Sequence, residues 1–181
     1  QHLELCRDIA QKFNNDFKVD DFFISPEPLI QKKFSRIMSL KDGKKKMSKS
    51  ELSDLSRINL TDEKDEIINK IKKAKTDSLP MPSTVYELDK RPEAKNLIGI
   101  SSSLVGKTLD DSIKEFSEKN FSDFKENLSQ VLVDKISPIS VEIKKLLKDK
   151  SYLDNILSVG GKKAEDIASK KMKKIHDIVG F

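Results

Sequence analysis

The sequence has 181 residues, of which 36% are hydrophobic and 36% are charged, so it holds enough apolar residues for a core. It contains 35 Lys and Arg against 30 Asp and Glu, and the net charge of +5 suits a polyanionic partner without proving one. The single cysteine excludes an internal disulfide, and the sequence has no run of about 18 apolar residues that would predict a membrane span.

The N-terminal segment, residues 2–14, is predicted to be an amphipathic helix. Its apolar side chains recur at helical spacing: Leu5, Ile9 and Phe13, with Cys6 and Ala10 beside them. Because Cys6 falls on this apolar stripe, we expect it to have a core role rather than to be a reactive thiol.

Two apolar runs before residue 41 predict extended structure. Residues 22–24 predict a buried strand or an ordered core segment, and Pro26 and Pro28 then favour an extended loop. Residues 34–40 predict a strand that leads directly into a basic loop. Ligands of open α/β sheets bind beyond the carboxyl ends of the strands, so this loop is a candidate ligand site.

The loop itself, residues 43–50, reads Gly-Lys-Lys-Lys-Met-Ser-Lys-Ser. Lys46 and Lys49 supply mobile positive charges, and lysine is a common phosphate partner in proteins. Ser48 and Ser50 add hydroxyl groups, and backbone N–H groups in such a loop can form a concave anion site. The pattern predicts an anion cradle; a solvated basic loop or a nuclear-import-like run is the alternative.

From about residue 61 the pattern is helical. Thr61 is a predicted N-cap, and the helix that follows has an apolar stripe through residues 67–74. Its other face is rich in lysine: Lys70, Lys72, Lys73 and Lys75. Such a face is either solvated or in contact with RNA, and the sequence leaves both interpretations open.

Turn and cap residues divide the rest of the chain. Pro92 suits the first turn of a helix, Gly106 is a predicted helix end, and Thr108 is a predicted N-cap. Pro138 is expected to kink or divide a long helix, and the pair at 160–161, Gly-Gly, is expected to break the last one.

Residues 46–50, Lys-Met-Ser-Lys-Ser, match without substitution the KMSKS signature of class I aminoacyl-tRNA synthetases. Further blocks of the chain resemble bacterial-type tryptophanyl-tRNA synthetases in order and spacing: residues 1–5, 7–10, 13–14, 36–40, 72–74, 76–78, 96–97, 102 and 104–106. Ser101 stands where that pattern has tyrosine, and Glu51 replaces the aspartate that commonly follows the signature.

The resemblance implies a fold and a division into domains. Residues 1–60 are expected to be an α/β remnant of a class I Rossmann-type catalytic domain, and residues 61–181 an all-α helical domain that supports the dimer and reads the tRNA anticodon. The chain should be mostly helical overall. The family's His-Ile-Gly-His type and Gly-Glu-Asp type motifs are not in this sequence. We therefore expect a C-terminal part of a longer enzyme that is inactive alone.

The resemblance also implies a reaction, in which tryptophan and ATP form tryptophanyl-adenylate before transfer to tRNA(Trp). Lys46 and Lys49 are the expected catalytic residues. The expected ATP-binding residues are Ile37, Lys46, Met47, Ser48, Lys49 and Ser50. ATP and Mg²⁺ are the expected cofactors, with no protein metal ligand identified, and a cytoplasmic homodimer without a membrane segment is the expected form.

Two alternatives stay open at this point. The chain could be a non-catalytic helical nucleic-acid-binding module that keeps a relict ATP loop. It could also come from a tyrosyl-tRNA synthetase, because tyrosine is the nearest alternative substrate in this branch of class I.

Overall fold

The computed structural model describes residues 1–29, 35–117 and 119–181, and the regular structure in those ranges is helical except for one isolated bridge between Met38 and Lys46. The elements are α1 (His2–Asp16), the short 3-10 helix η1 (Asp54–Ser56), α2 (Lys64–Lys72), α3 (Val85–Asp89), α4 (Pro92–Val105), α5 (Leu109–Phe116), α6 (Phe121–Lys148) and α7 (Lys150–Val179). The expectation of a mostly helical chain is confirmed.

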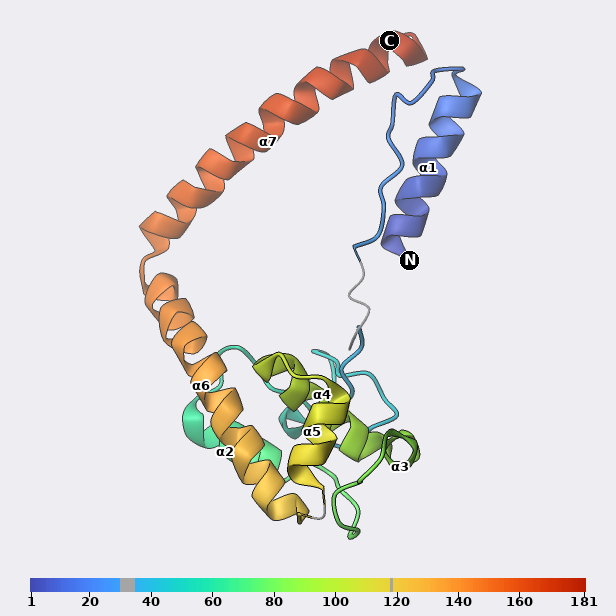
Figure 1. Cartoon of the computed structure of the whole chain (residues 1–181). Coiled ribbons are helices and arrows are strands. Elements are labelled where there is room, and N and C mark those ends of the chain that lie inside the picture. The colour runs from blue at the N-terminus through green and yellow to red at the C-terminus, as the bar shows by residue number, and fades with distance from the viewer. Residues whose placement is uncertain (30–34, 118) are drawn as a thin grey trace. The chain divides into compact units, whose positions relative to one another are not determined.

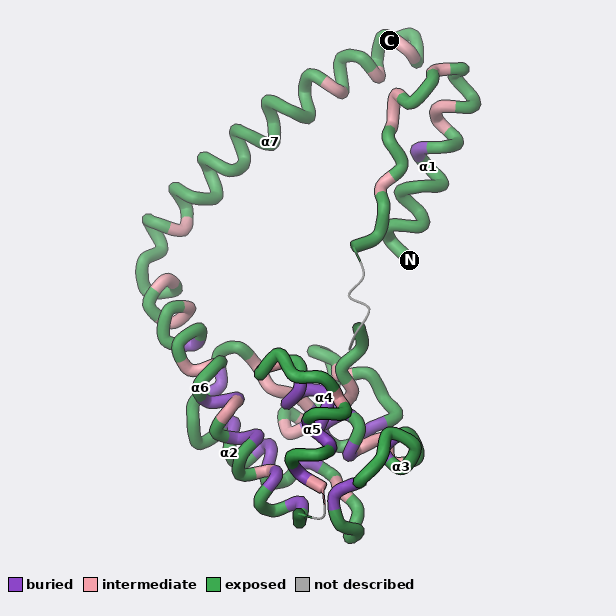
Figure 2. Tube along the Cα trace, in the orientation of Figure 1, coloured by how far each residue is buried: buried purple, intermediate pink, exposed green. Residues whose placement is uncertain are grey.

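The chain forms two compact units: Gln1–Gln31 with Asp149–Phe181, and Lys32–Lys148. In the second unit α2 lies along α6, and α4 packs against α3, α5 and α6 (Figure 1). Buried residues gather on α4 and on the first half of α6, whereas α7 has none (Figure 2). The main core therefore belongs to the second unit. Its most deeply buried large side chains include Leu40, Ile67, Ile71, Leu88, Leu97, Ile98, Phe124 and Leu128.

Helix α4 begins and ends where its sequence predicts. Pro92 is its first residue, where the missing N–H of proline costs nothing. Gly106 follows its last residue with a φ of 71°, a left-handed conformation that glycine adopts without strain. The Thr108 hydroxyl accepts a hydrogen bond from the Asp111 N–H and caps α5. These three predictions are confirmed.

Helix α2 begins later than predicted. Its N-cap is Glu63, whose side chain accepts from the Glu66 N–H while the Glu66 carboxylate accepts from the Glu63 N–H at 2.8 Å. This reciprocal capping box satisfies two N–H groups at once, so the prediction of Thr61 as the N-cap is wrong.

The long C-terminal helices are not interrupted where predicted. The prediction for Pro138 was a kink or a division: helix α6 continues through Pro138, so the helix is not divided there, and a kink stays a prediction. Helix α7 runs through residues 160–161, where each glycine costs only about 1 kcal/mol of helix stability. The break between the helices comes at Asp149, whose carboxylate caps α7 by accepting from the Tyr152 N–H at 2.9 Å.

The strand predicted at residues 34–40 does not form, and residues 22–24, predicted to be a buried strand or an ordered core segment, do not form a strand. Ile24 is 84% exposed, and the segment of residues 22–24 is irregular, held by the Asn14 side chain, which accepts from the Phe23 N–H at 3.0 Å and donates to the Phe23 carbonyl at 2.9 Å. Of the strand predicted at 34–40, residue 34 lies outside the described residues, and residues 35–40 contribute only the single bridge. The described residues thus contain no strand of a Rossmann-type sheet.

The apolar stripe of α1 is mostly on the surface. Cys6 is exposed, so its predicted core role is wrong, and Ala10 is the buried residue of this helix. Phe13 instead packs against the aromatic rings of Phe17, Phe22 and Phe23. No described helix combines the length and apolar character that crossing a membrane requires.

Lys70 is buried, although the sequence places it on a lysine-rich face. Its ammonium lies 2.6 Å from Asp54 Oδ2 and 2.6 Å from Asp62 Oδ2, and the Lys70 and Asp62 side chains are 4% and 6% exposed. Burial alone would lower the pKa of Lys70, but hydrogen bonds from its ammonium to Asp54 and Asp62 raise that pKa above its ordinary value. The ion pairs fasten α2 to the segment that precedes it.

Replacing this buried lysine should be costly. We expect Lys70→Met to lower the free energy of unfolding by about 3 kcal/mol, because Asp62 would stay buried without its cation. The exposed neighbour Lys73 provides a matched control: Lys73→Met should change stability by less than about 0.5 kcal/mol. Urea unfolding followed by circular dichroism measures both, and equal midpoints for the two variants would contradict the structural role.

Candidate functional site

The basic loop leaves and re-enters the molecule through a short antiparallel pairing. The Ser39 N–H donates to the Lys45 carbonyl at 2.8 Å, and the Met47 N–H donates to the Ile37 carbonyl at 3.0 Å. These two bonds flank the bridge between Met38 and Lys46. The pairing brings Ile37 beside the start of the KMSKS sequence, as a nucleotide site built from both would require.

The other edge of the same segment is satisfied without a neighbouring strand. The Asn96 side chain of α4 accepts from the Met38 N–H at 2.9 Å and donates to the Met38 carbonyl at 2.8 Å. The Leu40 N–H donates to the Ser56 carbonyl at 2.9 Å, and the Leu40 carbonyl accepts from the Lys75 N–H at 2.7 Å. Met38 and Leu40 therefore keep their backbone hydrogen bonds in an irregular setting.

Gly43 brings the loop into direct contact with the first turn of α4. Gly43 is buried, and a Cβ atom there would lie 2.5 Å from the Pro92 carbonyl carbon and 2.5 Å from the Glu93 nitrogen. Neither backbone atom can move freely, so only glycine fits. Glu93 is also paired with Lys75 at 2.9 Å. Burial alone would raise the pKa of Glu93, but the Lys75 ammonium and backbone N–H groups, including that of Gly43, lower it below its ordinary value.

The tip of the loop is open to solvent. Lys46, Ser48, Lys49 and Ser50 are exposed, whereas Met47 is half-buried and packs against the core. The Ser48 and Ser50 hydroxyls lie 2.9 Å apart, and the Ser50 N–H donates to the Ser48 hydroxyl at 3.3 Å. Among the ion pairs of the described residues, none includes Lys46 or Lys49. The loop therefore presents two ammonium groups that no described carboxylate neutralises.

Ile37 is 44% exposed, so it is not a core residue. Its side chain stands at the surface next to the loop base, where a flat apolar group could pack against it.

The chain that leaves the loop is fixed by a guanidinium group that sequence reasoning missed. Arg57 donates from Nη1 to the Glu51 carbonyl at 2.8 Å and pairs through Nη2 with Asp54 Oδ1 at 3.0 Å. Asp54 in turn is held by Lys70, and this hydrogen bond lowers the pKa of the Asp54 carboxyl. Asn96 was also missed; the available signal was a polar residue inside the apolar pattern of α4, where it is 6% exposed.

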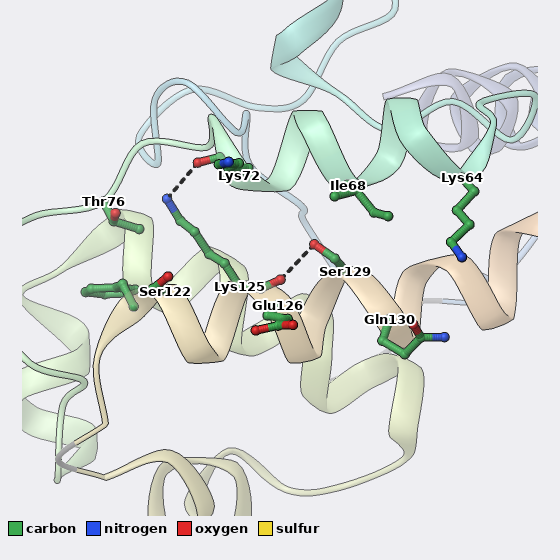
Figure 3. A pocket seen from close by; sticks show the side chains of 10 residues that line it. Lys64, Ile68, Lys72, Thr76, Ser122, Lys125, Glu126, Ser129 and Gln130 are labelled. Carbon is green, nitrogen blue, oxygen red and sulfur yellow. Dashed lines mark hydrogen bonds between the residues drawn. The ribbon is translucent and has the colours of Figure 1, made fainter.

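A second feature is a groove of about 670 Å³ between α2 and α6 (Figure 3). Lys64 and Lys72 line it from α2, and Lys125 lines it from α6, with Glu126 as a carboxylate on the same surface. The Lys125 ammonium donates to the Ala74 carbonyl at 2.6 Å, just beyond the C-terminal end of α2, and burial lowers its pKa. The lining carries more positive than negative charge, as an anion-binding surface would.

No group of three His, Cys, Asp or Glu side chains with the arrangement of a metal site occurs within the described ranges. Those residues therefore do not provide a protein-held cage for a divalent cation.

Several curated relatives of this chain carry the same enzyme name. The chain is 48% identical over its whole length to tryptophan--tRNA ligase of Caulobacter vibrioides and 48% identical to that of Brucella melitensis, covering 53% and 56% of those proteins. It is 45% identical to tryptophan--tRNA ligase of Rickettsia conorii, covering 54% of it. The chain thus spans about half the length of the curated relatives it matches.

Solved structures of tryptophanyl-tRNA synthetases are also similar to this chain. Tryptophanyl-tRNA synthetase from Mycoplasma pneumoniae superimposes with a TM-score of 0.81 at 28% identity, over 99% of this chain and 53% of that one. The enzyme from Campylobacter jejuni, complexed with ADP and tryptophan, gives 0.69 at 25% identity, over 99% of this chain and 54% of that one.

The family model of class I tRNA synthetases for tryptophan and tyrosine matches residues 1–136, which contain the whole of the loop and its anchoring residues. The resemblance drawn from the KMSKS sequence and its flanking blocks is confirmed. The chain belongs to the class I tRNA synthetases of the tryptophan and tyrosine group.

Proposed function

We propose that this chain is the C-terminal part of a tryptophan--tRNA ligase. That enzyme activates tryptophan with ATP to tryptophanyl-adenylate and transfers the tryptophan to tRNA(Trp). The observation that carries the proposal is the KMSKS loop, a pair of un-neutralised ammonium groups on a rigidly held base. The shared name of the relatives, and the ADP and tryptophan bound to the enzyme from Campylobacter jejuni, support it.

In the proposed reaction a carboxylate oxygen of tryptophan attacks the α-phosphorus of ATP. A bond forms between them, the bond from that phosphorus to the bridging oxygen breaks, and pyrophosphate leaves. No protein nucleophile is needed, because the enzyme positions the reactants and stabilises charge. Lys46 and Lys49 neutralise the negative charge that develops on the departing pyrophosphate. Lysine suits this role because its ammonium is a compact charge on a flexible stem.

The other predicted site residues act as binding groups in this proposal. The exposed side chain of Ile37 packs against the adenosine, Met47 seats the loop on the core, and the Ser48 and Ser50 hydroxyls face the phosphates. Mg²⁺ accompanies the triphosphate. No group of three potential protein ligands occurs among the described residues, and no step of the proposal depends on the ion.

The proposal assigns residues 1–60 to a Rossmann-type catalytic domain and residues 61–181 to a helical domain that binds tRNA. The lysine-lined groove between α2 and α6 supports the second assignment, because an RNA backbone carries regularly spaced phosphates. A homodimer and a cytoplasmic location stay predictions. The single cysteine fits a reducing compartment, and light scattering of the full-length protein would measure the oligomeric state.

Tyrosine is the alternative substrate within the same family. ATP–pyrophosphate exchange by the full-length protein, with each amino acid supplied separately, decides between them. We expect exchange with tryptophan and none with tyrosine. Exchange with tyrosine alone would move the chain to the tyrosine branch, and no exchange from folded protein would favour a relict loop on a nucleic-acid-binding module.

The second loop lysine should matter for rate more than for binding. In the full-length protein we expect Lys49→Ala to lower the rate of tryptophan activation by on the order of 10²-fold or more, since a preorganised charge at the leaving group is lost. The affinity for tryptophan should change far less. Lys44→Ala removes a neighbouring charge outside the KMSKS sequence and serves as the control. If pre-steady-state kinetics show an unchanged rate of tryptophan activation in Lys49→Ala, this residue has no part in the mechanism.

The groove lysines should contribute to tRNA affinity by neutralising phosphates. We expect Lys64→Ala combined with Lys72→Ala to weaken tRNA binding and to reduce the slope of log K against log salt concentration by about 0.7–0.9 for each phosphate that is no longer neutralised. The exposed lysines Lys114 and Lys135, outside the groove lining, give a control pair with the same change of charge. Filter binding across a salt series measures both pairs, and identical slopes would show that the groove does not bind RNA.

A further inference from the structure

The Asn96 side chain makes two hydrogen bonds to a single residue of the loop base. Its Oδ1 accepts from the Met38 N–H at 2.9 Å and its Nδ2 donates to the Met38 carbonyl at 2.8 Å. Asn96 is 6% exposed, and the two hydrogen bonds are partly buried. We propose that Asn96 is a positioning residue, which sets the location of the KMSKS loop and hence of its two lysines. The inference rests on the proposed function of that loop.

An amide is the group that fits this task. One primary amide offers a donor and an acceptor side by side, which match the N–H and C=O that one residue of an extended chain presents to a neighbouring strand. A carboxylate offers acceptors alone, and an apolar side chain offers neither. Asn96 thus takes the place of a missing strand at the edge of the loop base.

The position of Met38 determines the positions of both ends of the loop. Its neighbours on either side, Ile37 and Ser39, make the two backbone bonds that close the loop at Met47 and Lys45. A shift of Met38 therefore moves the residues on either side of Lys46. Small displacements of a charge at a reacting centre are costly, because stabilisation depends on where the charge lies in the transition state.

A second contact from the same helix face fixes the loop entrance. Glu93 lies three residues before Asn96, so the two side chains share one face of α4. The turn at Gly43 rests on the backbone of Pro92 and Glu93. Helix α4 consequently holds the loop at two points, the turn that opens it and the segment that carries both of its ends.

The chain offers a matched control. The Asn14 side chain makes the same pair of hydrogen bonds with Phe23, at 3.0 and 2.9 Å, on a segment that does not carry the loop. Asn14→Asp and Asn96→Asp therefore remove the same donor and introduce the same charge in two different places. Asn96→Ser is a second, smaller change that keeps the variant set informative if Asn96→Asp fails to fold.

The first measurement does not involve ATP. In the full-length protein, Asn96→Asp and Asn96→Ser should speed hydrogen exchange at the Ser39 and Met47 amides and trypsin cleavage after the loop lysines. The amides in the middle of α4 should stay protected, and Asn14→Asp should leave the loop as in the unmodified protein. Loop exchange and cleavage that stay unchanged in both folded Asn96 variants would overturn the proposal.

The second measurement separates positioning from a purely structural role. In Asn96→Asp and Asn96→Ser we expect the kcat for ATP–pyrophosphate exchange to fall about 10- to 100-fold, with the KM for tryptophan unchanged. A loss of thermal stability with kcat unchanged per folded molecule would leave Asn96 as a packing residue and overturn the proposal. If the unmodified protein shows no exchange, the proposed function fails, and hydrogen exchange and proteolysis still decide whether Asn96 positions the loop.

Discussion

The structure around the loop depends on one constraint: an extended segment must satisfy its backbone hydrogen bonds without a sheet. Unpaired backbone groups are expensive in a buried setting, so each needs a partner. The hairpin closes one edge, and the Asn96 amide closes the other at Met38, while Leu40 uses the backbone of Ser56 and Lys75. Those last two contacts come from segments on either side of α2. The loop base is therefore the point where α4 and both ends of the α2 region meet.

The base of the loop is fixed in place, and the exposed tip supplies the charges that would bind an anion. The charged groups beneath the loop are paired with one another, Lys70 with Asp54 and Asp62, and Lys75 with Glu93. The tip lysines are exposed, so they keep their hydration until a ligand replaces it. Because the charges in these pairs already neutralise one another, the pairs add little net field at the tip. The charge that a triphosphate would meet then comes from the loop itself.

The sequence predicts local features better than it predicts which distant residues pair with one another. The loop motif and the ends of α4 depend on nearby residues, and each was found from its own short pattern. The strand predicted at residues 34–40 was wrong, because an apolar extended run looks the same whether a strand or an amide side chain completes it. The burial of Lys70 was missed for a related reason: a helical lysine pattern gives no sign of the carboxylates at positions 54 and 62 that pair with it. Asn14 and Asn96 share a role that depends on a distant partner, which sequence spacing does not reveal.

Helix α7 has 30 residues and not one of them is buried. Lys171 of this helix contacts Phe22, but a helix without a buried face draws most of its stability from capping, propensity and neighbouring side chains, and these local terms act over a few turns at a time. Such a helix melts by gradual fraying rather than in one cooperative step. Heating the chain would then give an enthalpy by calorimetry that exceeds the value derived from the sharpness of the transition, and a single melting temperature would describe only the unit that contains α4.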